Sequence, residues 1–335
     1  MLGSRKKIRF TTVQLGPLRG TEVENALRLA GHTQRSFEFS ELLHPKFALP
    51  AAKYKCPNGG WNLDLAVRTI LVHRKFPRPV LFFSSLPYTD WDNRRKADWF
   101  YFADYVANGD EAVAIVSTHL WTTLPGDRTL QPYILLNLAA ASLSYTVDLP
   151  MHDETRGCIF DYCDDPADID CAIGVGELCQ ECERHLNAAL RDGRISIEQL
   201  ASARKLLNRA VGRRVAFLVM PFRSELEPIY AVMRKALESN GWVVVRADRI
   251  ARPRRITDAI VQAILSSDLV VADLTGANPN VFYEVGLAHA AGCDVVLVTQ
   301  DRAIPFDVSV ERAVRYKQSV RGLSRLAKEL GELTQ

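Results

Sequence analysis

Two carboxylates in the C-terminal third of the chain are the residues best placed to do chemistry. Asp273 closes a valine-rich apolar run at 269–272, and a second such run lies at 295–298, with a helical pattern between them. This pattern predicts a β-α-β unit with two buried parallel strands. Ligands of open α/β sheets bind beyond the carboxyl ends of the strands. We therefore expect Asp273 and Glu284, in the first or second turn of the intervening helix, to lie near one rim.

Paired carboxylates on such a rim suit cleavage of an N-glycosidic bond, which passes through a cationic, oxocarbenium-like state. Glu284 would stabilise or capture that cation, and Asp273 would hold sugar hydroxyls or protonate the leaving base. The main-chain N–H groups at 222–224, beside Arg223, would receive a phosphate. Two structural alternatives stay open: a surface glutamate favoured by the helix dipole, and an aspartate that bonds its own turn. The sequence has neither a Walker A motif nor GxGxxG, which argues against ATP hydrolysis and dehydrogenase chemistry.

A second chemical signal is a cluster of cysteines in the middle of the chain. Cys158 and Cys163 form one closely spaced pair, and Cys179 and Cys182 form another fifteen residues further on. Two such pairs match what tetrahedral thiolate zinc requires, and four thiolates leave no open position, so the zinc would be structural. Cys171, between the pairs, is expected to lie outside the shell. The alternative is a set of reduced thiols without a metal.

Length and composition limit the classes of protein to which the chain can belong. The 335 residues indicate two domains. The composition, 47% hydrophobic and 24% charged, is that of globular protein, and a net charge of +3 points to no particular partner. The basic N-terminus lacks an apolar signal segment, and no run is long enough for a membrane span. Seven cysteines, an odd number, favour free thiols or a metal site, and we expect a cytoplasmic protein.

We expect an α/β protein of three parts. Residues 1–186 form an α+β domain with strands near 8–15, 80–84 and 111–117 and an apolar helix at 130–145. Residues 187–213 form a basic helical connector, which Ser196 and Gln199 open as a capping box. We interpret the connector as a solvated spacer, with a nucleic-acid patch as the alternative. Residues 214–335 alternate about five strands with helices, which predicts a doubly wound, flavodoxin-like parallel sheet.

Three segments of the C-terminal part carry a resemblance: LVMPF at 218–222, ADLTGANPNVFYEVGLAHA at 272–290 and IPFD at 304–307. They resemble the nucleoside 2-deoxyribosyltransferase-like branch of the fold shared with TIR-type NAD glycohydrolases. The resemblance implies that Glu284 attacks or stabilises the anomeric carbon, with Asp273 beside it, and that the substrate is a nucleoside, a nucleotide or NAD. The substrate-binding residues would be Met220, Pro221, Phe222, Arg223, Asp248, Asn278 and Asn280.

The N-terminal part resembles the archaemetzincin-like metallopeptidases. The resemblance rests on AIVSTHLW at 114–121, on the helix that follows it and on the cysteine array. It implies a metzincin-like domain whose cysteines hold a structural zinc and whose helix carries HExxHxxGxxH for a catalytic zinc. Here the helix reads YILLNLAAASLSYTVDL, without histidine or glutamate, and only His152 follows before Cys158. Catalytic zinc needs about three ligands and a general base, so we expect a catalytically inactive relative that can bind a peptide or protein partner.

The resulting hypothesis is an N-glycosidase or base-exchanging transferase. The alternative is a non-catalytic nucleotide sensor coupled to a protein-interaction domain, and a third hypothesis is a scaffold. A two-domain chain of this kind resembles bacterial defence effectors, including antiviral ones, by analogy alone. We expect a homo-oligomer without membrane association.

Overall fold

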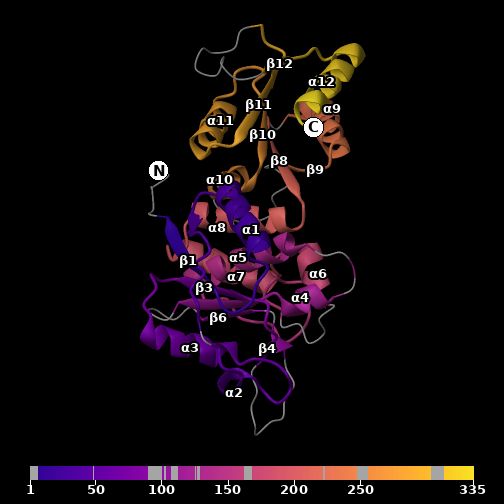
Figure 1. The fold of residues 1–335 in the computed structure, drawn as a ribbon. Coiled ribbons are helices and arrows are strands. Elements are labelled where there is room, and N and C mark those ends of the chain that lie inside the picture. The colour runs from indigo at the N-terminus through magenta and orange to yellow at the C-terminus, as the bar shows by residue number, and fades with distance from the viewer. Residues whose placement is uncertain are drawn as a thin grey trace. The chain divides into compact units, whose positions relative to one another are not determined.

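The computed structural model describes residues 7–47, 49–89, 100–101, 103–106, 112–124, 126, 129–161, 168–221, 223–246, 256–302 and 313–335. They belong to two compact units, an N-terminal unit of residues 1–211 and a C-terminal unit of residues 212–335 (Figure 1). None of the described helices is long and apolar enough to cross a membrane.

The N-terminal unit is built on a mixed sheet. Its strand order is β2-β1-β3-β7-β6, where β1, β2, β3 and β7 are parallel and β6 pairs antiparallel with β7. The strands are β1 (Ile8–Gln14), β2 (Phe37–Phe39), β3 (Val80–Ser84), β6 (Ala103–Val106) and β7 (Val113–Ser117). A separate pair joins β4 (Tyr88–Thr89) to β5 (Phe100–Tyr101). The central strand β3 is buried throughout, as a strand covered on both faces must be.

Helices cover both faces of this sheet. One core combines a sheet face with α1 (Gly20–Thr33), α5 (Leu130–Thr146) and α8 (Ile197–Ala210), and the other packs the opposite face on α3 (Leu63–His73). Helix α5 is buried at nearly every position, because its sequence is apolar on all sides. The remaining helices of the unit are α2 (Ala51–Tyr54), α4 (His119–Thr123), α6 (Asp168–Val175) and α7 (Gln180–Arg191).

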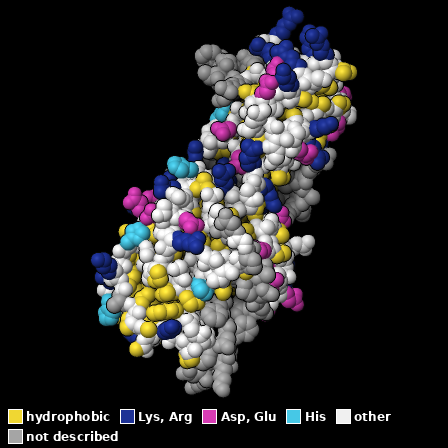
Figure 2. Space-filling model, turned by 45° about the vertical axis from the view of Figure 1, so that its right-hand side comes forward, with side chains coloured by type: hydrophobic (Ala, Val, Ile, Leu, Met, Phe, Trp, Pro, Cys, Tyr) yellow, Lys and Arg dark blue, Asp and Glu magenta, His cyan; other side chains and the backbone are white. Residues whose placement is uncertain are grey.

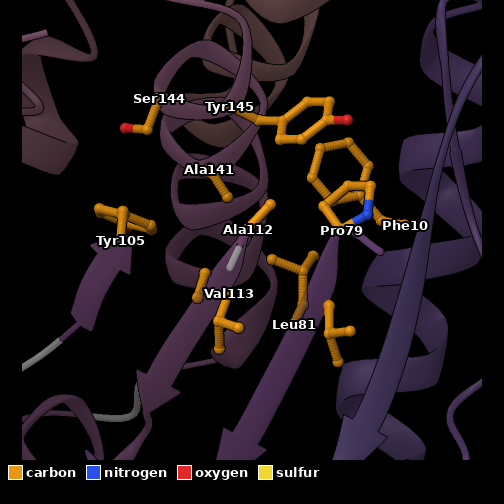
Figure 3. A pocket seen from close by; sticks show the side chains of 11 residues that line it. Phe10, Pro79, Leu81, Tyr105, Ala112, Val113, Ala141, Ser144 and Tyr145 are labelled. Carbon is orange, nitrogen blue, oxygen red and sulfur yellow. The ribbon is translucent and has the colours of Figure 1, made fainter. Parts of the chain in front are cut away.

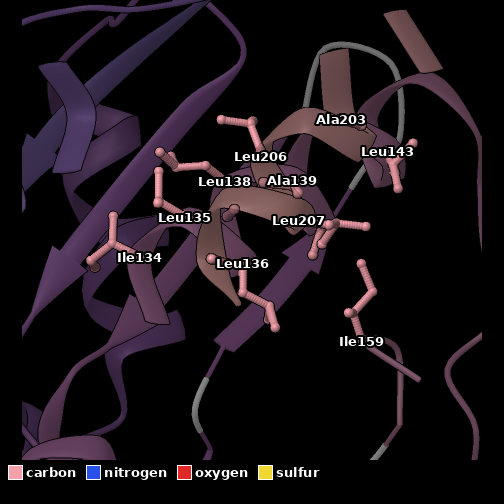
Figure 4. Close-up of a cluster of buried hydrophobic side chains, with 14 of the residues drawn as sticks. Ile134, Leu135, Leu136, Leu138, Ala139, Leu143, Ile159, Ala203, Leu206 and Leu207 are labelled. Atoms are coloured by element: carbon pink, nitrogen blue, oxygen red, sulfur yellow. The ribbon is translucent and has the colours of Figure 1, made fainter. Parts of the chain in front are cut away.

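Helix α8 is packed into the core and is not the solvated connector that the sequence predicted. Its capping box is present as predicted, but Ala203, Leu206 and Leu207 are buried against α5 (Figure 4). The Ser202 hydroxyl also donates a hydrogen bond of 2.9 Å to Ser36 Oγ, far back in the sequence. The reason is the apolar stripe of the helix, which can be removed from water only by packing on a neighbour. The described segment 187–211 therefore belongs to the N-terminal unit, and the division falls two residues before the expected one.

The basic character of this helix is partly neutralised. Arg204 Nη2 lies 2.6 Å from Glu183 Oε1 on α7, and both side chains are largely buried. On the face shown in Figure 2, acidic and basic side chains are interspersed over most of the surface. The surface in view does not form the continuous basic stripe that a nucleic-acid site requires.

The C-terminal unit is a five-stranded, all-parallel sheet in the described residues, with the order β12-β11-β10-β8-β9. The strands are β8 (Arg214–Val219), β9 (Trp242–Arg246), β10 (Leu269–Asp273), β11 (Asp294–Thr299) and β12 (Ala313–Arg315). Numbered within the unit, this order is 5-4-3-1-2, the flavodoxin-like arrangement. The predicted α/β fold class is confirmed.

Two helical layers enclose this sheet, as Figure 1 shows. A short 3-10 helix, η2 (Ser224–Leu226), leads into α9 (Glu227–Ser239), which packs with α12 (Val320–Leu333) on one face. Helices α10 (Ile256–Ser266) and α11 (Pro279–Ala291) cover the other face. Since α11 follows β10 directly, its first turns lie at the carboxyl edge of the sheet, where β10 ends.

Candidate functional site

Asp273 is the last residue of β10 and is fully buried. Its Oδ1 accepts hydrogen bonds from Thr275 N at 3.0 Å and from Thr275 Oγ1 at 2.5 Å, and its Oδ2 accepts one from the Tyr316 hydroxyl at 2.6 Å. Both oxygens are thus used by residues of the protein itself. This is the geometry of an aspartate that closes its own turn, which was one of the two interpretations left open by the sequence.

Burial and hydrogen bonding shift the pKa of the Asp273 carboxyl group in opposite directions. Burial raises the pKa of Asp273, while the hydrogen bonds from Thr275 and Tyr316 act to lower it. The pKa of Tyr316 is raised because its hydroxyl is buried and lies beside the Asp273 carboxylate. Tyr316 follows β12 directly. The three residues therefore fix the loop after β10 to the last strand of the sheet.

The loop between β10 and α11 is held in a defined conformation. Gly276 and Ala277 both have positive φ angles, and the Gly276 N–H donates to Asp301 Oδ2 at 2.8 Å. Ala277 is in the left-handed region without being a glycine, a strained state that persists only where its surroundings enforce it. Asn278 caps α11, because its Oδ1 accepts from Asn280 N at 2.9 Å, and Pro279 follows as the first helical residue.

Glu284 stands apart from this network. It lies in the second turn of α11 and is half-buried, while Val285 is fully buried and Tyr283 is 58% exposed. Burial raises the pKa of Glu284 to about 7. Among the described residues its carboxyl group has no hydrogen bond or ion pair. A desolvated carboxyl group without a partner is typical of a functional position, because a structural carboxylate is usually paired.

The other residues expected to bind substrate lie at several places. Met220 and Pro221 are buried at the end of β8, which pairs with β10 so that Val219 is opposite Ala272. Both therefore lie at the same sheet edge as Asp273. Arg223 is exposed before η2, and Asn280 is exposed at the start of α11. Phe222 and Asp248 lie outside the described residues, as does the segment 304–307.

The cysteine cluster lies in the N-terminal unit. His152, Cys158, Cys179 and Cys182 each offer one ligand atom, and these four atoms lie within 4.8 Å of one another. His152 Nε2 is 3.2 Å from Cys182 Sγ and 3.1 Å from Cys179 Sγ, and the sulfurs of Cys158 and Cys182 are 3.8 Å apart. His152, Cys158 and Cys182 are buried, and Cys179 is partly buried.

Local structure explains how these side chains converge. Asp161 Oδ2 accepts from Cys158 N at 2.8 Å and from Arg156 N at 2.5 Å, which shapes the turn that presents Cys158. Cys179 is the N-cap of α7, and Cys182 lies in the first turn of that helix. A helix N-terminus favours a thiolate. The cluster is part of the main hydrophobic core of the unit, so its geometry is held by packing.

The pKa values of the two buried cysteines are shifted in opposite directions. The sulfur–sulfur hydrogen bond with Cys182 lowers the pKa of Cys158 to about 5, helped by main-chain N–H groups of Cys179 and Phe160. The pKa of Cys182 is raised, because its thiol shares a hydrogen bond with Cys158 and is buried. A thiolate in this cluster is therefore stabilised even before a cation binds, and a bound cation would favour further deprotonation.

Three of the four predicted zinc ligands lie close together in the structure. Cys158, Cys179 and Cys182 converge, Cys171 is exposed, and Cys163 lies outside the described residues. Sequence reasoning missed His152 as a member of the group. The available signal was the position of a single histidine in the loop just before Cys158, close to the array in sequence.

The donor set fits zinc. Three sulfurs and one imidazole nitrogen are a common tetrahedral zinc shell. With Zn–S bonds of about 2.3 Å, a tetrahedral site separates two sulfurs by about 3.8 Å, and Cys158 and Cys182 are at that separation. Four protein donors leave no position for water or substrate, so a metal here would stabilise the fold rather than react.

Two pockets in the N-terminal unit lie among residues other than those of the cysteine cluster. One has a volume of about 10 Å³, enough for a single water at most, and lies between strand ends and α5 beside Phe10 and Tyr145 (Figure 3). The other, of about 300 Å³, is lined by α3 and the edge of the sheet. Asp104 in this second pocket has a raised pKa, because it is buried and lies near Asp64.

Comparison with known proteins finds solved structures of low similarity. No protein-family model matches the sequence. No curated protein matches it either. Among solved structures, an archaemetzincin from Methanopyrus kandleri is 14% identical, covers 57% of this chain and 99% of its own, and has a TM-score of 0.39.

Two further solved structures are similar to the C-terminal part. A CMP N-glycosidase from Clostridium botulinum is 20% identical over 36% of this chain and 99% of its own, with a TM-score of 0.30. A 2-desoxiribosyltransferase from Leishmania mexicana is 19% identical over 33% of this chain and 76% of its own, with a TM-score of 0.25. Both classes of protein that the sequence resembles are thus found among these similar structures. The sequence identities and TM-scores are too low to assign an activity.

Proposed function

We propose that the C-terminal unit is an N-glycosidase or base-exchanging transferase acting on a nucleoside, a nucleotide or NAD, with Glu284 as its catalytic carboxylate. One observation carries the proposal. Glu284 is a half-buried carboxyl group in the second turn of the helix that follows β10, and among the described residues nothing pairs with it. Burying an unpaired carboxylate costs free energy. A cationic sugar in the transition state would supply the missing partner.

The chemistry requires few groups. A Glu284 oxygen forms a bond to the anomeric carbon while the carbon–nitrogen bond breaks, and the bonding electrons leave with the base. A neutral base takes up a proton from solvent, whereas the cationic nicotinamide of NAD leaves as a neutral base without one. Water then adds its oxygen to the anomeric carbon, gives up a proton to solvent and releases the carboxylate, or a second base takes the place of water. Hydrolysis and base exchange therefore differ only in the acceptor. The raised pKa of Glu284 increases the basicity of the ionised carboxylate and hence its reactivity toward a cationic carbon.

Asp273 has a positioning role in this proposal. Its two oxygens are bonded to Thr275 and Tyr316, so it holds the loop that leads into α11 rather than the substrate. Asn278 and Pro279 continue that loop and start the helix that carries Glu284. Met220, Pro221, Arg223 and Asn280 are the described candidates for substrate contacts.

The test is base release. The full chain is incubated with NAD, with 2′-deoxynucleosides and with nucleoside monophosphates, CMP included, and free base is measured by chromatography. We expect release from at least one of them, and loss of release in Glu284→Gln. Glu332→Gln, which changes an exposed glutamate on α12, is the matched control. Release that is equal in all three proteins would refute the proposed role of Glu284.

A specific observation also favours the sensor alternative. Both oxygens of Asp273 accept hydrogen bonds from Thr275 and Tyr316. Of the two predicted carboxylates, Glu284 alone is then left for the reaction, where a general acid and a nucleophile would be two. A site of this kind can bind a nucleotide without cleaving it. Nucleotide binding by calorimetry, without any base release, would support the sensor over the enzyme.

We also propose that the cluster of His152 and three cysteines holds a structural zinc. Support comes from the donor types, their mutual distances and their burial. Elemental analysis of the purified protein should find about one zinc per chain, and less than about half would contradict the proposal. The expected peptide or protein partner of the N-terminal unit, the homo-oligomer and the role in defence remain predictions from the sequence.

A further inference from the structure

We propose that a cavity on the α3 face of the N-terminal sheet binds a small molecule that carries a basic group on an apolar body. The cavity has a volume of about 300 Å³ and shares no lining residue with the cysteine cluster. It belongs to the N-terminal unit, whereas Glu284 belongs to the C-terminal unit. Binding here is therefore separate from the proposed base release and from the proposed zinc site.

The walls of the cavity are mainly aliphatic. They come from α3, through Val67, Leu71 and Val72, and from β7, through Val113 and Ile115. Val72 is 80% exposed, so a ligand that contacts it removes apolar surface from water. Small-molecule sites commonly have volumes of about 300–1,000 Å³, apolar walls and a few polar groups that orient the ligand. The cavity fits this description.

One of its polar groups is Asp104 on the edge strand β6 (Figure 1). Neighbouring side chains on a strand point to opposite faces of the sheet, and the Tyr105 hydroxyl donates to Asn137 Oδ1 on α5 at 2.5 Å. Asp104 therefore points to the α3 face, where Ile115 is its partner on β7. A carboxylate opposite an isoleucine gains no favourable cross-strand pairing, so the stability of the sheet does not explain this residue.

The carboxyl group of Asp104 is poorly compensated by the protein itself. Among the described residues it forms no ion pair, and the hydrogen bond that it accepts from the Tyr88 hydroxyl is long, at 3.5 Å. Burial raises the pKa of Asp104, and the nearby Asp64 carboxylate raises it further, while the Tyr105 N–H and the Tyr88 hydroxyl act to lower it. A cation of the ligand beside Asp104 would replace the solvation that the carboxylate has lost.

Two arginines also line the cavity, but they lie in contact with solvent. The side chain of Arg68 is 73% exposed, and its Nε is 2.8 Å from Asp64 Oδ2. Arg78 is exposed as well. Water and salt screen exposed charges, whereas a desolvated charge acts on a neighbouring group much more strongly. Asp104 therefore decides the sign of the ligand charge, and the aliphatic walls favour an apolar body.

Matched probes of different charge test the class of ligand. Benzamidine and isopentylamine each carry a cation on an apolar body, benzamide is the neutral counterpart of benzamidine, and benzoate is an anion of similar shape. Binding to the full chain is measured by saturation-transfer NMR. We expect both cations to bind at millimolar concentration, and benzamide and benzoate to bind about tenfold or more weakly, since they lack a charge-assisted hydrogen bond to Asp104. Absence of binding of both cations at about 10 mM, or preferential binding of benzoate, would overturn the proposal.

Two variants test the dependence on Asp104. Asp104→Asn replaces the carboxylate with a neutral group of the same shape, and we expect it to bind benzamidine about tenfold or more weakly than the parent does. Asp148→Asn, at an exposed aspartate outside the cavity, is the matched control and should bind as the parent does. Urea unfolding verifies that both variants are folded. Equal binding of benzamidine by Asp104→Asn and the parent would refute the role of Asp104.

A basic side chain of another protein has the same chemistry as the proposed ligand. A blocked tripeptide with a central arginine distinguishes this source in the same NMR assay. Weaker binding of the tripeptide than of benzamidine would support a small-molecule ligand. Tighter binding of the tripeptide would overturn the proposal in favour of a protein partner.

Discussion

Replacing Glu284 with glutamine should weaken activity and strengthen the fold at the same time. The substitution keeps the size and most of the hydrogen-bonding capacity of the side chain and removes its negative charge. The Glu284 side chain is half-buried, and among the described residues its carboxylate has no partner. Its charge is therefore useful only to the reaction. In the folded protein without substrate, the same charge destabilises the fold.

The size of that cost follows from the pKa. Burial raises the pKa of Glu284 from an ordinary value of 4.5 to about 7. A shift of this size corresponds to about 3 kcal/mol of stability lost once the group is ionised. The side chain is only half-buried, and solvent screens part of the penalty, so we expect about 2 kcal/mol.

The pH dependence has a definite sign. The folded protein holds the proton of Glu284 more tightly than the unfolded chain does, because its folded pKa is the higher one. The carboxyl group therefore costs nothing below pH 4.5, and its cost grows as the pH rises towards about 7. Glutamine does not titrate. The stability difference between the variant and the parent should be small at pH 5 and reach its full value at pH 8.

Urea unfolding at pH 5 and pH 8 measures this difference, with Glu332→Gln as the control for an exposed glutamate. Base release is measured on the same samples. Preorganised electrostatic groups commonly contribute about 3 kcal/mol to the transition state, so release should fall about a hundredfold or more. If the variant is no more stable than the parent at pH 8, Glu284 is not desolvated and the structural reasoning is refuted. If the variant is more stable but fully active, the catalytic role alone is refuted.

Further predictions address the other parts of the molecule. Base release per unit of enzyme should rise with pH and level off above about pH 7, because the ionised form of Glu284 reacts; a rate profile that falls over this range would contradict that role. Tyr316→Phe should lower stability by about 1–3 kcal/mol in urea unfolding, because it leaves a buried oxygen of Asp273 without its donor. Asp273→Asn should reduce base release less than Glu284→Gln does, in assays at saturating substrate. Leu206→Ala should cost about 2–5 kcal/mol, since α8 is part of the core, whereas a solvated connector would tolerate it. A strong chelator should lower the melting temperature of the chain, and protease assays should find no chelator-sensitive cleavage, since the apolar helix α5 carries no metal ligand.

Periodicity and composition were sufficient for the C-terminal unit. Its strands are continuous runs of valine, leucine and alanine between turn residues, and this pattern arises only when a strand is covered on both faces. Strand, loop and helix alternate, so connection rules leave few topologies. The predicted position of Asp273 at the end of a strand and of Glu284 early in the following helix agrees with β10 and α11.

The N-terminal unit was less accessible to sequence reasoning. Short strands such as β2 and β6, and helix α3, lack a long periodic signal and depend on their neighbours in the sheet and core. Helix α8 was detected through its capping box, but its partner was not, because an amphipathic pattern shows that one face is buried without showing against what.

The sequence by itself determined which chemical groups are present and, through local spacing, which of them share a turn or a helix. It placed Cys179 and Cys182 at the start of one helix, and Glu284 in the helix that follows β10. Only the tertiary structure decided what each group contacts. Contacts such as Asp273 with Tyr316, or His152 with Cys182, join residues that are distant along the chain. They form because burial of apolar surface brings whole elements together, and local propensities carry no information about such pairings.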